Sequence, residues 1–196
     1  GNNLVERNVF ASLSGAIGVS GGPMGDKGDN VIRNNVIGTD PSGTEPFATR
    51  SGIVNNPSAK RTLIENNLIA ATQNNGIVLN GSDSIARGNI IGANRAQTAT
   101  LGNSGVGIFV SGLNQVVENN VIVASSAGGI QIRGSGEDTH DIVRGNFIGT
   151  TANGSQFGNN GIGVEVRTVG AVLIEHNTIA FNSGPGVGIG GLGPVG

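Results

Sequence analysis

The sequence predicts an all-β protein, a parallel β-solenoid of about seven turns, and three observations support this fold class. One seven-residue block recurs seven times, a glycine followed by alternating aliphatic residues comes after each block, and the charge at one block position alternates in sign. A period in the twenties that contains short strands separated by turns is typical of a coil with one turn per repeat. The 36 glycines and 25 asparagines among 196 residues supply the turns, and this composition excludes helical bundles and coiled coils.

The recurring block reads apolar, apolar, charged, Asn or a similar residue, Asn, apolar, and usually Ile, as in VIRNNVI at 31–37 and LIENNLI at 63–69. Its fifth residue is always asparagine, and we call these residues the ladder asparagines: Asn8, Asn35, Asn67, Asn89, Asn120, Asn146 and Asn177. Asparagine and glycine tolerate left-handed backbone angles, so we expect the ladder asparagines to lie where the chain turns a corner. Stacked asparagine side chains can also hydrogen-bond along the solenoid.

The second motif predicts a strand after each block. In Gly76-Ile77-Val78-Leu79 and its equivalents, apolar residues alternate with period two, and we expect Ile77 and Leu79 to point inward. Within the blocks, the residues three before and two after each ladder asparagine are also expected in the core, for example Ile64 and Ile69. About four inward residues per turn would make a long, thin hydrophobic core.

The charged position of the block predicts the register between turns. Two residues before the ladder asparagines, the sequence reads Glu6, Arg33, Glu65, Arg87, Glu118, Arg144 and Glu175. In a solenoid these side chains stack at strand spacing, where opposite charges attract and like charges repel. A chain that slipped by one turn would place Glu over Glu, so the column favours one register.

Three long polar arms follow every second turn, at 38–51, 92–104 and 149–160. Each has an apolar residue at a comparable offset, Phe47, Leu101 and Phe157, and we expect each arm to fold back and tuck this residue onto the solenoid. Two outward apolar stripes need such cover, from the arms or from a partner. They comprise the residues four before and one after the ladder asparagines, for example Leu63, Ile85 and Val116, and Leu68, Ile90 and Val121.

These motifs resemble the right-handed parallel β-helix repeat proteins of the pectate-lyase-like superfamily, and in particular bacterial surface or exported proteins whose repeats read N-x-I-G-T-D. The copies that carry the resemblance most clearly are 35–40 and 146–151. The resemblance implies a right-handed solenoid and a secreted or cell-surface location. It does not select an activity, because proteins of this fold include lyases, hydrolases, phage spikes and adhesins.

Enzymes of the resembling superfamily that cut acidic polysaccharides use clustered aspartates, sometimes with calcium. Of the 13 carboxylates here, four belong to the charged column and no Asp-Asp pair occurs, so we predict no catalytic, cofactor-binding or metal-binding residue and no cofactor. Two acidic loops remain open as calcium sites, the loop with Asp26 and Asp29 and the loop with Glu137, Asp138 and Asp141. In the second loop, His140 with Asp138 and Asp141 forms a possible general acid and base group, weighed against simple solvation of the loop.

We predict that residues 1–196 form a single β-solenoid domain, a slice of a longer repeat protein. The leading function is a non-enzymatic, exported or cell-surface spacer, stalk or adhesive scaffold that contacts carbohydrate or a cell-surface protein through its arms. The alternatives are a polysaccharide lyase or hydrolase, and a fibre subunit that associates end to end. A net charge of −2 with only 12% charged residues argues against nucleic acid as a partner, and the absence of long apolar runs argues against membrane insertion.

Overall fold

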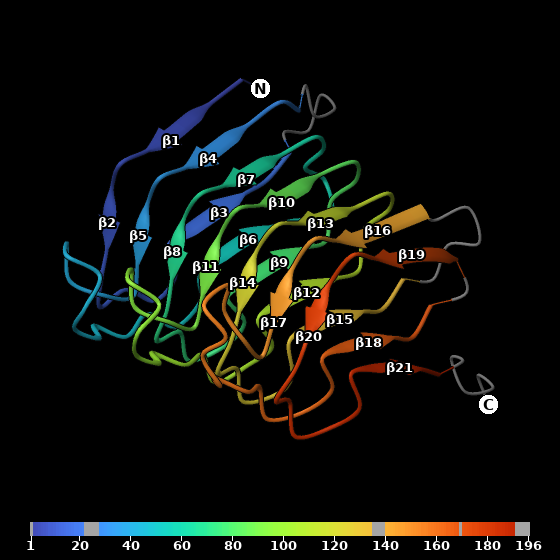
Figure 1. Ribbon diagram of the computed structural model, residues 1–196. Coiled ribbons are helices and arrows are strands. Elements are labelled where there is room, and N and C mark those ends of the chain that lie inside the picture. Colours follow the sequence, from blue (N-terminus) through green and yellow to red (C-terminus); the bar gives the residue numbers. More distant parts are fainter. Residues whose placement is uncertain (1, 22–27, 135–139, 169, 191–196) are drawn as a thin grey trace.

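The computed structural model describes residues 2–21, 28–134, 140–168 and 170–190, and it consists of three parallel sheets wound into one solenoid (Figure 1). Each turn contributes one strand to each sheet. Sheet A contains β1 (Leu4–Glu6), β4 (Val31–Arg33), β7 (Leu63–Glu65), β10 (Ile85–Arg87), β13 (Val116–Glu118), β16 (His140–Arg144) and β19 (Ala171–Glu175). Sheet B contains β2 (Val9–Phe10), β5 (Val36–Ile37), β8 (Leu68–Ile69), β11 (Ile90–Ile91), β14 (Val121–Ile122), β17 (Phe147–Ile148) and β20 (Thr178–Ile179).

Sheet C is built from the second motif. It contains β3 (Ile17–Val19), β6 (Ile53–Asn55), β9 (Ile77–Leu79), β12 (Ile108–Val110), β15 (Ile130–Ile132), β18 (Val164–Val166) and β21 (Val187–Ile189). The predicted all-β solenoid of seven turns is therefore confirmed. None of the described residues belongs to a helix that is long and apolar enough to cross a membrane.

The register between turns is the predicted one. Arg87 lies opposite Glu65 on one side and Glu118 on the other, and the whole charged column is aligned in the same way. The inward positions are also as predicted, since Ile64, Ile69, Ile77 and Leu79 have no exposed surface. Because the side chains of equivalent residues stack directly above one another, one continuous core runs through the turns.

The corner between sheets A and B is made by the ladder asparagines. The residue before each of them has a positive φ, between 55° and 65°, in all seven turns, including the non-glycine, non-asparagine residues Arg7 and His176. Within the ladder, Asn89 Oδ1 accepts hydrogen bonds from Asn67 N–H at 2.9 Å and Asn67 Nδ2 at 3.0 Å. Asn89 Nδ2 in turn donates to Asn120 Oδ1 and to the carbonyl of Ile64. Buried corner groups are thereby satisfied along the solenoid axis.

The two other corners also contain buried polar columns, which were not predicted from the sequence. The corner between sheets C and A, which we call the C–A corner, holds residues five positions before a ladder asparagine: Asn30, Thr62, Ser84, Gln115 and Asp141. The corner between sheets B and C holds Thr49, Thr72, Asn103, Ser125 and Asn159. Their signal in the sequence is a polar residue five positions before the ladder asparagine, or three to four positions before the glycine that precedes the strand of sheet C.

The arms leave the corner between sheets B and C and fold into small hairpins (Figure 1). Each is closed by a hydrogen bond from the N–H of its apolar residue to the carbonyl of its first glycine, as from Phe157 to Gly149. Phe157 packs against Ala93, Val121 and Val123 as expected. The same expectation is wrong for Phe47, whose relative exposure is 48%. In turn one, the residue equivalent to Val123 is Ala11. Because alanine has a smaller side chain than valine, less apolar surface lies beneath Phe47 than beneath Phe157.

Candidate binding surface

The middle of the outer face of sheet B is covered by the arms. Leu68 and Val121, from the stripe that follows the ladder asparagines, are buried although they point outward. A Cβ placed on Gly43 would lie 2.4 Å from Leu68 Cδ2, so the first arm rests directly on this side chain. The first two arms also touch each other, because Arg95 N–H donates to the Gly43 carbonyl at 3.1 Å. Cover of this stripe by the arms, one of the two options predicted, is confirmed for its middle turns, whereas Val9 at one end is exposed.

The outer face of sheet A is not covered by the arms, and it carries the second aliphatic stripe. We call this stripe the sheet A furrow, and it consists of Leu4, Val31, Leu63, Ile85, Val116, Ile142 and Leu173. The two end members are 52% and 50% exposed, whereas the five between them are half-buried. An aliphatic stripe on an open sheet face is a candidate contact surface.

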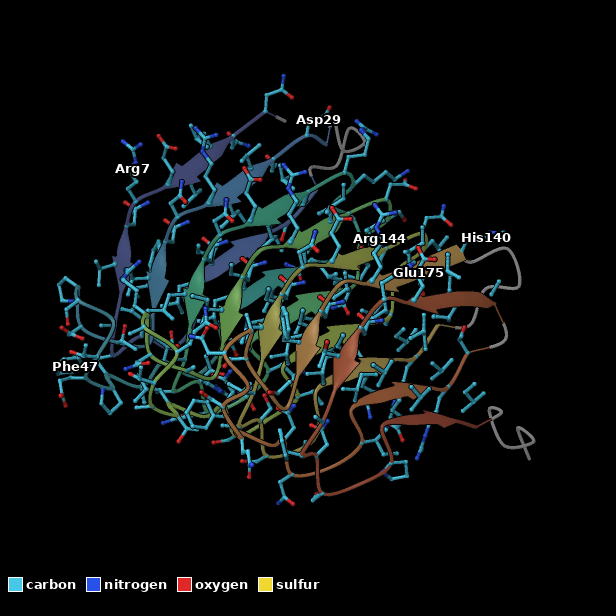
Figure 2. All side chains as sticks on the ribbon, viewed as in Figure 1. Arg7, Asp29, Phe47, His140, Arg144 and Glu175 are labelled. Carbon is cyan, nitrogen blue, oxygen red and sulfur yellow. The ribbon has the colours of Figure 1, made fainter. Side chains whose placement is uncertain are left out.

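One bank of the furrow is the alternating charged column. Arg33, Arg87 and Arg144 each lie 2.7 Å from a carboxylate oxygen of the glutamate in the preceding turn. The glutamates of the second and third pairs are 13% exposed in their side chains, while the arginines are close to half exposed. The guanidinium groups therefore form the outer edge of this bank, as Figure 2 shows for Arg144.

The other bank is a mixed polar column six positions before the ladder asparagines. Arg61 forms an ion pair with Asp29 at 3.0 Å, and Asn114 Nδ2 donates to Asp83 Oδ1 at 3.1 Å. The hydrogen bond from Arg61 holds the pKa of Asp29 below its usual value. Together the two banks carry six carboxylates and four arginines, so this face has a small excess of negative charge. This second bank was not predicted from the sequence.

The outer face of sheet C changes character along the solenoid. Val54, Val78 and Phe109 form a half-buried apolar row in its middle, and the row continues into Gln131 and Glu165. Glu165 accepts a hydrogen bond from Gln131 and forms an ion pair with Arg167 at 2.7 Å. The carboxylate is thus already bonded within the protein.

Of the residues in the two acidic loops left open as calcium sites, only Asp29 and Asp141 lie within the described residues. The Asp29 carboxylate is paired with Arg61, and Asp141 is buried in the C–A corner. Asp26, Glu137 and Asp138 lie outside the described residues. Among the residues that the structure describes, no three His, Asp or Glu side chains gather at a spacing suited to a metal ion.

Of the possible general acid and base group of His140 with Asp138 and Asp141, Asp138 lies outside the described residues, and the other two side chains do not face one another. Both residues belong to β16, where successive side chains point to opposite faces, so His140 is exposed while Asp141 is buried. Figure 2 shows His140 at the outer end of this strand. The sequence placed both residues in a loop, where no alternation would have separated them.

Asp40, from the N-x-I-G-T-D motif, has a local structural role. Its carboxylate accepts hydrogen bonds from the backbone N–H groups of Ser42, Thr44 and Glu45, and from the Ser42 hydroxyl. These bonds hold the pKa of Asp40 far below its usual range, and the Ser42 hydroxyl contributes most. The amide oxygen of Asn94 makes equivalent bonds in the second arm. The motif aspartate therefore shapes a turn.

Two comparisons, with curated proteins and with solved structures, gave no match. A family model described as the right-handed beta helix region matches residues 1–148. This match covers more than half of the chain and agrees with the three stacked parallel sheets, so the predicted right-handed winding is confirmed. The match supports the scaffold and does not choose between structural, adhesive and enzymatic members. The chain belongs to the right-handed beta helix family.

Proposed function

We propose that this protein is a non-enzymatic scaffold, exported or displayed at a cell surface, that acts as a rigid spacer and makes adhesive contacts along its length. The observation that carries the proposal is the one-to-one pairing of all three sheets through seven turns. The location rests on the resemblance of the repeats to those of bacterial surface and exported proteins.

Stiffness follows from how the turns are joined. Each turn is hydrogen-bonded to the next through three strands, and buried polar columns add side-chain bonds at the corners. Bending the solenoid would have to open several of these bonds together, with buried polar groups left unpaired. A rod of this stiffness would keep the structures attached to its two ends at a constant distance from each other.

The sheet A furrow is the contact surface that the geometry favours. Its apolar stripe suits an apolar surface of a partner, and the flanking banks of both charge signs suit a protein partner with mixed charges. The excess of carboxylates over arginines on these banks disfavours an acidic polysaccharide at this face. The first arm, with the exposed Phe47 at its edge, is a second contact surface of the same scaffold.

The test compares the protein with a furrow variant that carries Ile85→Lys and Val116→Lys. Beads coated with either protein are passed over immobilised extracellular-matrix proteins and over neutral and acidic polysaccharides. Ile85 and Val116 point outward, so we expect the variant to fold and to lose retention on the protein probes. A control with Gln73→Lys and Ser126→Lys adds the same charge at exposed positions beside the corner between sheets B and C, and should retain binding.

Two results would overturn the proposal. Release of unsaturated or newly reducing products from acidic polysaccharides, with or without calcium, would show a lyase or hydrolase. Filaments that grow with protein concentration in electron micrographs would show a fibre subunit. Retention that survives in the furrow variant and is lost in Phe47→Ser would move the contact surface to the first arm and leave the scaffold function in place.

A further inference from the structure

Asp141 is the only buried carboxylate among the described residues, with 2% relative exposure. It occupies the C–A corner in turn six, where the four preceding turns have the neutral residues Asn30, Thr62, Ser84 and Gln115. An isolated charge in such a position is costly unless it is paired, and in practice the group neutralises instead. Whether the Asp141 carboxyl is protonated or ionised therefore affects the stability of this corner.

The hydrogen bonds around Asp141 leave two acceptors without a donor. Asp141 Oδ1 accepts the Gln115 N–H at 2.7 Å, whereas the buried Oδ2 has no partner. Gln115 Nε2 donates to the carbonyls of Gly81 and Leu113, both at 2.7 Å, whereas the buried Gln115 Oε1 has no partner. The two unpartnered oxygens thus belong to side chains on consecutive turns that are already joined by a hydrogen bond.

A proton on Asp141 Oδ2 would provide the donor that both oxygens lack. A protonated carboxyl group supplies an O–H donor that an ionised carboxylate lacks, and it removes the buried charge. We infer that in acid Asp141 carries a proton in the folded protein and donates Oδ2–H to Gln115 Oε1, which makes the C–A corner of turn six an acid-stabilised lock.

The local electrostatics agree with this assignment. Burial raises the pKa of Asp141 to about 6, against the opposing effects of the Gln115 N–H and of His140. The described titratable groups on the packed strands face outward: His140 and Arg144 on β16, Glu118 on β13 and Glu175 on β19. Asp83, further back along the chain, is bonded to Asn114. None of them is bonded to Asp141 Oδ2.

The direction of the pH effect follows from the raised pKa. A carboxyl whose pKa is higher in the folded than in the unfolded protein stabilises the fold fully below its ordinary pKa of 3.8. This contribution is lost as the pH rises through about 6, when the carboxyl gives its proton to solvent and becomes a buried anion. The lock therefore holds in acid and loosens at neutral and higher pH.

The experiment follows thermal unfolding of the protein and of Asp141→Asn between about pH 4 and pH 8. The asparagine amide supplies a neutral donor for Gln115 Oε1, so we expect the midpoint of the variant to stay level where that of the parent protein falls. Asp83→Asn, which neutralises an exposed carboxylate, is the matched control and should keep the parent's fall. A second measurement on the unaltered protein follows the ¹³C carboxyl signal of Asp141, which should titrate near 6.

Each other outcome would overturn the inference. The inference fails if the unfolding midpoint of Asp141→Asn falls with pH as that of the parent protein does, or if the variant is less stable than the parent at about pH 8. Either result would show that the fold accommodates the ionised carboxylate. A ¹³C titration at the ordinary value of 3.8 would show the same even if the variant failed to fold. A rise in the unfolding midpoint on addition of calcium, absent in Asp141→Asn, would show that Asp141 binds a metal ion and not a proton.

Discussion

Arg87 Nη2 lies 2.7 Å from Glu65 Oε2, across one turn of sheet A, and Arg87 Nε lies 2.9 Å from the same oxygen. The other two arginines of the column also bind the glutamate of the preceding turn. Within the described residues, the alternating column therefore consists of three separate ion pairs, with Glu175 in register above Arg144 but paired with His176 at 3.6 Å. Such half-exposed ion pairs add little to the free energy of folding, so their main effect is on the register between turns.

Glu65→Arg is expected to destabilise the protein by about 1–2 kcal/mol, because it removes one ion pair and places Arg between Arg33 and Arg87. Urea unfolding measures the change in free energy. Glu65→Gln removes the pair without like-charge repulsion and should cost less than about 1 kcal/mol. Equal losses in the two variants would show that the column does not act through charge.

Gly92→Ala is expected to prevent folding or to destabilise the protein by more than about 4 kcal/mol. Gly92 has a φ of 85°, and an added Cβ would lie 1.8 Å from the Val123 carbonyl oxygen, a backbone atom that cannot move aside. Gly154 has a similar φ of 78° but open space around its Cβ position, so Gly154→Ala should cost only about 1–2 kcal/mol of backbone strain. Thermal unfolding compares the two, and similar losses would contradict the role of the close approach.

Phe157→Ala should open the third arm, because this ring covers Val121 and Val123 on the outer face of sheet B. A half-buried ring predicts a loss of about 1–3 kcal/mol and faster proteolysis within residues 149–160. Phe47→Ala removes an equivalent but largely exposed ring and should cost under about 1 kcal/mol. A larger loss for Phe47 than for Phe157 would contradict the observed difference in packing.

The first arm should open in acid, whereas the second should not. The pKa of Asp40 is lowered in the folded arm, so its contribution is present above the ordinary value of 3.8 and is lost as the pH falls below it. Asn94 makes the equivalent bonds without a titrating group. NMR should therefore show the Thr44 and Glu45 amide signals shifting in acid while those of Thr98 and Ala99 stay in place. Parallel shifts in both arms would point to a general acid effect.

The repeating parts of the fold could be predicted from the sequence because they follow local rules. Alternation with period two marks strands, and a residue that tolerates positive φ marks each corner, so residue spacing alone was enough to predict the inward positions and the register. The furrow was predicted as one of two outward stripes, but which stripe the arms would cover was not. That choice depends on where the arms leave the solenoid and how far they reach.

The solenoid, its seven turns and the alternating charges are properties of the sequence, since each depends on residues at a constant spacing along the chain. The roles of Asp141, Phe47 and the second bank of the furrow depend instead on tertiary packing. A carboxylate that looked like part of a loop became buried because strand β16 begins at His140 and turns Asp141 inward. Phe47, which was expected to pack onto the solenoid, is exposed because the residue beneath it in the neighbouring turn is the small Ala11. Both outcomes depend on contacts between turns, which lie more than 20 residues apart in the chain.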